Sequence, residues 1–199
     1  TTLSRMRNQQ AAKESLDSLA KSIRVADNTM EKIGKVVDRM SATVKNVIKN
    51  YPPFFNGSDD RIKLLNSFNS LRRQIDQMTM PPDNFTAMTI MASPENIPEH
   101  GDWEFMSQNE GVHELIARRE VHTGEEGLDI PELPAEITDQ ELYEVLDKLE
   151  KALKTLEERR SGLASDAQAV SQYGAVNGKS GNQEETLAEQ LKITDLTES

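Results

Sequence analysis

The stretch that decides the fold is residues 16–51, LDSLAKSIRVADNTMEKIGKVVDRMSATVKNVIKNY. Apolar side chains recur along it at alternating spacings of three and four residues, and most positions between them are polar. The apolar positions are Leu16, Leu19, Ile23, Ala26, Met30, Ile33, Val37, Met40, Val44, Val47 and Tyr51. This heptad pattern predicts one helix from about residue 4 to residue 50, ended by Tyr51-Pro52-Pro53 because proline bars helical continuation. Such a helix is about 70 Å long and needs a partner helix to cover its apolar side.

Two further amphipathic helices are predicted. The turn Asn56-Gly57-Ser58-Asp59 supplies an N-cap for the first, and Pro81-Pro82-Asp83 ends it. Its apolar positions are Ile62, Leu65, Phe68, Leu71, Ile75 and Met78. The second opens with the capping-box spacing of Thr138 and Glu141. Its stripe is Leu142, Val145, Leu149, Leu153, Leu156, Leu163, Ala167 and Val170, broken once by Arg160. The glycines of 173–183 are expected to end or interrupt this helix, before a last amphipathic piece at 184–196.

The middle of the chain has a different pattern. From Asn84 the apolar spacing becomes two, which predicts a strand through Met91, and two more strands are expected around Trp103 and Phe105 and over 112–121. The predicted fold class is therefore mainly α with a small β-rich middle, built as a long antiparallel helical rod. The expected divisions are 1–83 (amino-terminal rod helices), 84–135 (β-rich middle) and 136–199 (carboxy-terminal rod helix and tail).

Composition excludes several classes of protein. The chain has 199 residues, no cysteine and only 5% aromatic residues, and no apolar run reaches the ~20 residues of a membrane span. A disulfide scaffold, a thiolate zinc site and a cysteine nucleophile are excluded. The net charge of −11 is unevenly placed: residues 1–50 carry ten Lys/Arg against five Asp/Glu, whereas residues 95–199 carry nine against twenty-five. This balance disfavours nucleic-acid binding and allows the two ends of the chain to attract each other.

Residue patterns for catalysis or metal binding are weak. His100, His113 and His122 lack the i, i+4 spacing of a helical zinc site, and the glycines lack the context of a phosphate-binding loop. Adjacent acids such as Glu157-Glu158 are more simply explained as solvated side chains. We therefore expect no cofactor, no metal site and no catalytic residue.

Several stretches, taken in order, resemble bacterial flagellin and especially its inner rod domain. Residues 4–9 (SRMRNQ) resemble the family's Arg-x-Arg-x-Gln helix, and residues 26–40 are similar to its run from Ala-Glu-Gly-Ala-Leu to Gln-Arg-Met. Residues 58–77 resemble the family's short second helix, and Asn84-Phe85 stands where a Phe-Asn-Gly often leads into a β-hairpin. Residues 142–170, with Arg160 followed by Gly162-Leu163, are similar to the carboxy-terminal rod helix.

The resemblance implies a non-enzymatic structural subunit of a bacterial flagellar filament, or of a flagellin-like assembly, that acts by subunit packing. Its partners would be other copies of itself, related flagellar subunits and an export chaperone. It would be extracellular, in the bacterial flagellum, after export without a cleaved signal peptide. The residues then expected at subunit interfaces are Arg5, Arg7, Gln9, Asp38, Arg39, Met40, Arg61, Asp76 and Arg160.

Two other hypotheses stay open. A helical adaptor, or a protein associated with type III secretion, would bind a partner through its heptad seam and would need that seam exposed. An enzyme would need a groove near Trp103, His113 and His122, and is the weakest of the three hypotheses.

Overall fold

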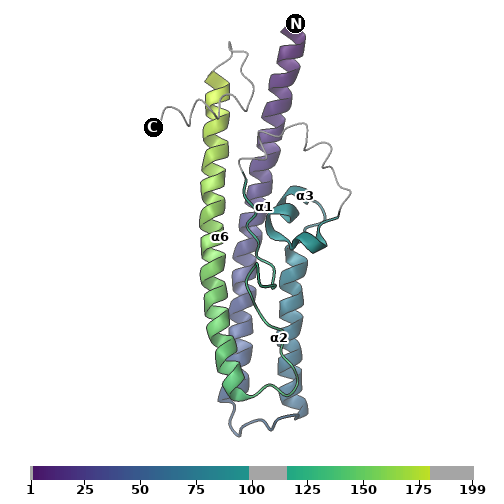
Figure 1. Ribbon diagram of the computed structural model, residues 1–199, viewed down its shortest axis with the longest axis vertical. Coiled ribbons are helices and arrows are strands. Elements are labelled where there is room, and N and C mark those ends of the chain that lie inside the picture. The colour runs from purple at the N-terminus through teal and green to yellow at the C-terminus, as the bar shows by residue number, and fades with distance from the viewer. Residues whose placement is uncertain (1, 99–115, 180–199) are drawn as a thin grey trace.

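The computed structural model describes residues 2–98 and 116–179, which are mainly helical. The elements in chain order are α1 (Thr2–Lys49), α2 (Asp59–Met78), α3 (Phe85–Met91), the 3-10 helix η1 (Pro94–Asn96) and α6 (Asp139–Lys179). α1 lies in the centre, and both α2 and α6 run antiparallel to it (Figure 1). The short α3 packs on α1 near the far end of α2. The predicted helical rod with antiparallel partners is confirmed for the described residues.

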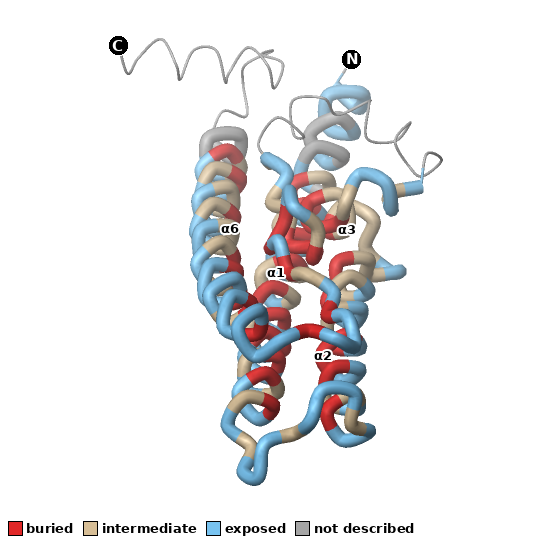
Figure 2. Tube along the Cα trace, turned by 60° about the horizontal axis from the view of Figure 1, so that its bottom comes forward, coloured by how far each residue is buried: buried red, intermediate tan, exposed pale blue. Residues whose placement is uncertain are grey.

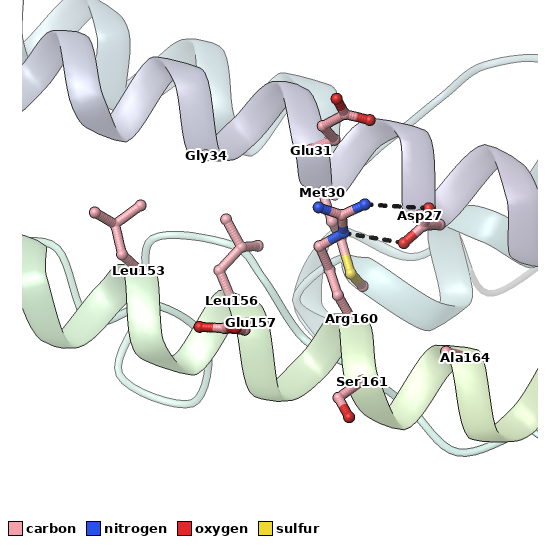
Figure 3. A pocket seen from close by; sticks show the side chains of 10 residues that line it. All are labelled: Asp27, Met30, Glu31, Gly34, Leu153, Leu156, Glu157, Arg160, Ser161 and Ala164. Carbon is pink, nitrogen blue, oxygen red and sulfur yellow. Dashed lines mark hydrogen bonds and ion pairs between the residues drawn. The ribbon is translucent and has the colours of Figure 1, made fainter.

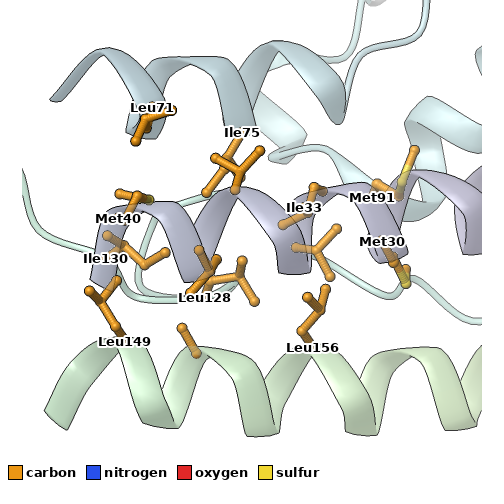
Figure 4. Packing of buried hydrophobic residues seen from close by; sticks show 14 of the residues in the cluster. Met30, Ile33, Met40, Leu71, Ile75, Met91, Leu128, Ile130, Leu149 and Leu156 are labelled. Atoms are coloured by element: carbon orange, nitrogen blue, oxygen red, sulfur yellow. The ribbon is translucent and has the colours of Figure 1, made fainter. Parts of the chain in front are cut away.

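One hydrophobic core holds these elements together. Every predicted apolar position of α1 from Leu16 to Val47 is buried, so the buried residues form a continuous line along the helix (Figure 2). Side chains of α2, α6 and the segment before α6 pack onto the same line, including Leu128 and Ile130 (Figure 4). Fully burying one such side chain contributes roughly 1.5–3 kcal/mol, so the long seam is the main stabilising feature. Tyr51 was expected in this seam, but its position beyond the end of α1 leaves it 92% exposed.

The helix ends follow local sequence rules. α1 ends at Lys49, just before Tyr51-Pro52, and Ser58 caps α2 by accepting a hydrogen bond from the Arg61 N–H at 3.4 Å. The predicted capping box of α6 is present. The Thr138 hydroxyl accepts from the Glu141 N–H at 3.2 Å, and the Glu141 carboxylate accepts from the Thr138 N–H at 2.8 Å. These reciprocal bonds satisfy backbone donors that the start of a helix leaves without partners.

The described part of α6 ends at Lys179, inside the stretch 173–183 where the sequence predicts an end or an interruption, but the first glycine of that stretch does not break the helix. α6 continues through Gly174 to Lys179. Val170 and Tyr173 are buried on the side that faces α1, and a Cβ at Gly174 would lie 4.0 Å from Leu16 Cδ1. Packing against a neighbouring helix outweighs the cost of about 1 kcal/mol that a glycine adds to a helix interior. The predicted amphipathic piece at 184–196 lies outside the described residues.

The predicted small β-rich middle is not supported, because the described parts of the chain contain no strand. The first expected strand is helix α3, which begins where the Asn84 side chain accepts a hydrogen bond from the Ala87 N–H at 2.9 Å. Ala87, Ile90 and Met91 are buried, which is helical rather than alternating spacing. Residues 116–121 are neither helix nor strand. The N–H groups of Arg119 and Val121 bond to the last carbonyls of α3, at 2.7 and 3.0 Å. Trp103 and Phe105 lie outside the described residues.

Candidate functional site

A groove of about 520 Å³ lies between α1 and α6. Figure 3 shows its two walls. α1 contributes Asp27, Met30, Glu31 and Gly34, and α6 contributes Leu153, Leu156, Glu157, Arg160, Ser161 and Ala164. Gly34 faces Leu156, and a Cβ at position 34 would lie 3.4 Å from the Leu156 Cδ2 atom, so the two helices approach closely there.

An ion pair bridges the groove. The Arg160 guanidinium donates from Nε to Asp27 Oδ1 at 3.0 Å and from a terminal nitrogen to Asp27 Oδ2 at 3.3 Å (Figure 3). This bidentate bond with Asp27 raises the pKa of Arg160, and the charge of Glu31 adds to the effect. Glu31 and Glu157 are exposed and form no ion pair within the described residues. The groove therefore has an apolar floor and a rim with three carboxylates and one guanidinium.

A second polar arrangement lies on α2 and holds the segment 116–138 against the bundle. Asn69 forms two bonds with one residue: its side-chain amide donates to the Leu133 carbonyl at 2.9 Å and accepts from the Leu133 N–H at 2.8 Å. Arg72 donates to the Ile130 carbonyl at 2.8 Å. Asp76 accepts bonds from both the N–H and the hydroxyl of Thr123, each between 2.8 and 3.0 Å. These side chains give backbone groups outside a helix the partners that they need when buried.

The other edge of this segment is held by α6. Arg119 donates to the Asp166 carboxylate at 3.2 and 3.3 Å, and it covers Gly162, where a Cβ would lie 2.6 Å from the guanidinium carbon. His122 is buried, with Nε2 3.1 Å from Glu120 and Nδ1 accepting from the Gly124 N–H at 3.0 Å. Both ring nitrogens of His122 thus have partners within the same turn. The side chain therefore stabilises that turn.

The expected interface residues occupy three kinds of position. Exposed ones are Arg5, Arg7, Asp38 and Arg39, while the side chain of Gln9 lies outside the described residues. Met40 and Arg61 are buried, and Arg61 donates to the Ile137 carbonyl at 2.8 Å and to Asp139 at 2.9 Å. Asp76 and Arg160 are partly buried, and their partners are Thr123 and Asp27. Met40, Arg61 and Asp76 therefore make contacts inside the chain.

Sequence patterns did not single out Asp27, Asn69 or Thr123. The one available indication was Arg160, a charged residue in the middle of an apolar stripe, which suggests a polar partner on the facing helix. Asn69 and Thr123 carry no such indication because their partners are set by how the segment 116–138 crosses α2.

No family model, curated protein or solved structure matches this chain. Within the described residues, no three histidine, aspartate or glutamate side chains gather as metal ligands would. The helices of the described regions include none with the length and apolarity of a membrane span. Trp103, His100 and His113 lie outside the described residues, so the groove postulated for an enzyme near Trp103 stays a prediction. The α1–α6 groove, with its apolar and charged lining and the Asp27–Arg160 ion pair, is therefore the candidate functional site.

Proposed function

We propose that this chain is a non-enzymatic structural subunit of a flagellin-like bacterial filament, acting through packing between copies. The proposal includes an extracellular location, export without a cleaved signal peptide, and an export chaperone as a transient partner. Its first support is the order of the stretches that resemble flagellin, from residue 4 to residue 170. The architecture is compatible with it, because a rod of long parallel and antiparallel helices offers a large lateral surface to neighbouring copies.

The observation that carries the proposal is the placement of the exposed large apolar side chains. Leu3 and Met6, at the start of α1, are 75% and 63% exposed. Tyr51, Phe55 and Tyr143 are the other exposed large apolar residues of the described regions, and they lie around the connection of α1 to α2 and the start of α6. These two groups stand at opposite ends of the bundle (Figure 1). Apolar side chains concentrated at both ends of a rod favour contacts between copies.

Charge supports the same proposal. The first thirteen residues contain three basic residues, Arg5, Arg7 and Lys13, and no acidic ones. Residues 132–147 at the other end contain six acidic residues and no basic one. Ends of opposite charge attract in a head-to-tail arrangement, and such a heterologous contact extends into a filament when it does not close into a ring.

The alternative, a helical adaptor, needs an apolar seam that is open to a partner. From Leu16 to Val47 the seam of α1 is buried within the chain, which favours the structural subunit. The two hypotheses differ in solution behaviour. A subunit associates with itself as its concentration rises, whereas an adaptor stays monomeric until its partner is added.

The test is assembly of the 199-residue chain. Sedimentation velocity over a wide concentration range and electron microscopy of negatively stained samples should reveal elongated oligomers or filaments. Raising the salt concentration should weaken them, because the charged ends are screened over about 10 Å at 0.1 M. A chain that stays monomeric at every concentration and is absent from purified appendages of the source cells contradicts the proposal.

A further inference from the structure

We propose that Asn56 is a site of spontaneous deamidation, in which the backbone nitrogen of Gly57 attacks the side-chain amide of Asn56. The two residues lie in the connection of α1 to α2, at one end of the rod (Figure 1). The inference does not rest on the proposed function, because it concerns the chemistry of one turn and not the assembly of copies.

The turn leaves both reacting groups accessible. The Ser58 N–H closes it by donating to the Phe55 carbonyl at 3.0 Å, so Asn56 and Gly57 occupy its two central positions. Both central residues are exposed. Among the described residues, neither the Asn56 side chain nor the Gly57 N–H has a hydrogen-bond partner. The attacking nitrogen therefore has no bond to break, and solvent reaches the amide.

Gly57 also hinders the attack less than any other residue would. It has no Cβ beside the attacking nitrogen, and its φ of +79° lies in the region that glycine adopts readily. Even a Cβ built at this position would meet nothing within 4 Å, so neighbouring segments leave the turn free to move. The Asn56 side chain and the following nitrogen can therefore approach each other without displacing packed atoms.

The reaction needs only water as a co-reactant. A bond forms between the Gly57 nitrogen and Asn56 Cγ, and the Cγ–Nδ2 bond breaks. Nδ2 leaves as ammonia, taking the proton of the Gly57 amide, and a cyclic imide remains. Water then opens the imide at one of its two carbonyl carbons. Opening at Cγ gives aspartate at position 56, and opening at the main-chain carbonyl gives isoaspartate.

The chain carries its own comparison. It has one other Asn-Gly pair, Asn177-Gly178, and this pair lies inside α6. In a helix each backbone N–H donates to a carbonyl four residues earlier, and the backbone dihedrals are fixed. Asn177 must leave the helical conformation before the Gly178 nitrogen can reach its side chain. The same dipeptide is therefore protected in α6 and unprotected in the turn before α2.

The modification changes the exposed end of the rod. Either product adds one negative charge beside Phe55, which is 84% exposed. Isoaspartate also adds a methylene group to the main chain between Phe55 and Ser58, and this alters the turn that their 3.0 Å bond closes. Ser58 is the residue that caps α2, so the effect reaches the first turn of that helix.

The test compares the two asparagines in one sample. The folded 199-residue chain is incubated at mildly alkaline pH and physiological temperature, and trypsin then releases residues 50–61 and 161–179, each with one Asn-Gly pair. Mass spectrometry follows the loss of each amide. We expect Asn56 to react at least about fivefold faster than Asn177, because local opening of α6 must precede reaction there.

Unfolding the chain supplies the control for local sequence. In concentrated guanidinium chloride the turn and the helix are both absent, so the two rates should become equal to within about twofold. Asn56→Gln should abolish the product in residues 50–61 and leave the rate at Asn177 unchanged. Asn56→Asp provides a marker for the aspartate product in ion-exchange chromatography of the intact chain.

The products show which atom attacks. A mixture of aspartate and isoaspartate at position 56 supports attack by the Gly57 nitrogen, because only the cyclic imide opens in two ways. Aspartate without isoaspartate overturns that route. Equal rates at Asn56 and Asn177 in the folded chain, or a faster rate at Asn177, overturn the assignment of the turn as the reactive site. Neither result bears on whether copies of the chain assemble.

Discussion

Arg160 of α6 and Asp27 of α1, 133 positions apart in the chain, form a bidentate ion pair across the groove. The pair lies beside the close approach of Gly34 and Leu156, and together the two contacts set the register of the antiparallel helices. A slip by one turn would separate the charges and place the Leu156 side chain against a residue that has one of its own.

The ion pair should contribute modestly to stability. Its side chains are 38% and 42% exposed, so water screens the attraction, and exposed pairs typically contribute about 0.2–1 kcal/mol. A double-mutant cycle with Arg160→Ala and Asp27→Ala, measured by urea denaturation, should give a coupling energy within that range. An energy indistinguishable from zero would mean that the pair does not set the register. Glu157→Ala and Glu31→Ala, in the same groove without an ion pair, provide the matched control cycle.

Replacing Asn69 should lower the free energy of unfolding. Asn69→Ala removes both partners of the buried Leu133 backbone, and an unsatisfied buried polar group costs about 1–3 kcal/mol. We expect a loss of about 2–4 kcal/mol in the free energy of unfolding and faster hydrogen exchange in the segment 116–138. Asn66→Ala, at an exposed position of α2, should change stability by less than about 0.5 kcal/mol. Equal effects of the two substitutions would show that the Asn69 bonds contribute nothing.

Two glycine-to-alanine substitutions should have opposite effects on the stability of the folded chain. At Gly127 a Cβ would collide with the carbonyl oxygen of His122, inside a turn where the Leu128 N–H donates to that same oxygen at 2.7 Å. Gly127→Ala should therefore be destabilising by about 1–3 kcal/mol, since the backbone must shift. Gly174→Ala, where the nearest described atom is Leu16 Cδ1 at 4.0 Å, should stabilise α6 by about 0.5–1 kcal/mol. Thermal unfolding of both variants measures the contrast, and a stabilising Gly127→Ala would refute the described turn.

The capping box of α6 should make stability depend on pH. Bonds from the N–H and hydroxyl of Thr138 lower the pKa of Glu141 below its ordinary value of 4.5. A carboxyl with a lowered pKa in the folded chain stabilises it above that ordinary value, and this stabilisation is lost as the pH falls through the lowered pKa. Unfolding free energies at neutral pH and well below pH 4.5 should show the loss in the unmodified chain.

Glu141→Gln isolates the contribution of the titrating group. Glutamine accepts the same hydrogen bonds without titrating, so the difference in stability between this variant and the unmodified chain should shrink on acidification. A difference that stays constant over the whole range would exclude ionised Glu141 as its source.

How much of the fold the sequence predicts depends on the range of the interactions involved. The bounds of α1 and α2 and the capping box of α6 follow from heptad spacing, prolines and side chains within four residues of each other. The strand that the sequence predicts over residues 85–91 is a helix, because a seven-residue apolar segment fits either period. The choice depends on the Asn84 cap and on burial against α1.

The features of the candidate site also fall into those that the sequence determines and those that depend on the tertiary structure. The sequence by itself determined that α1 would be a long helix with one apolar side and a basic start, because periodicity and charge are properties of the chain alone. Only the tertiary structure decided that Asp27 meets Arg160, that Asn69 holds Leu133 and that Gly34 packs against Leu156. It likewise decided that α6 continues past Gly174. Each of these depends on the register between segments far apart in the chain, and packing rather than local propensity sets that register.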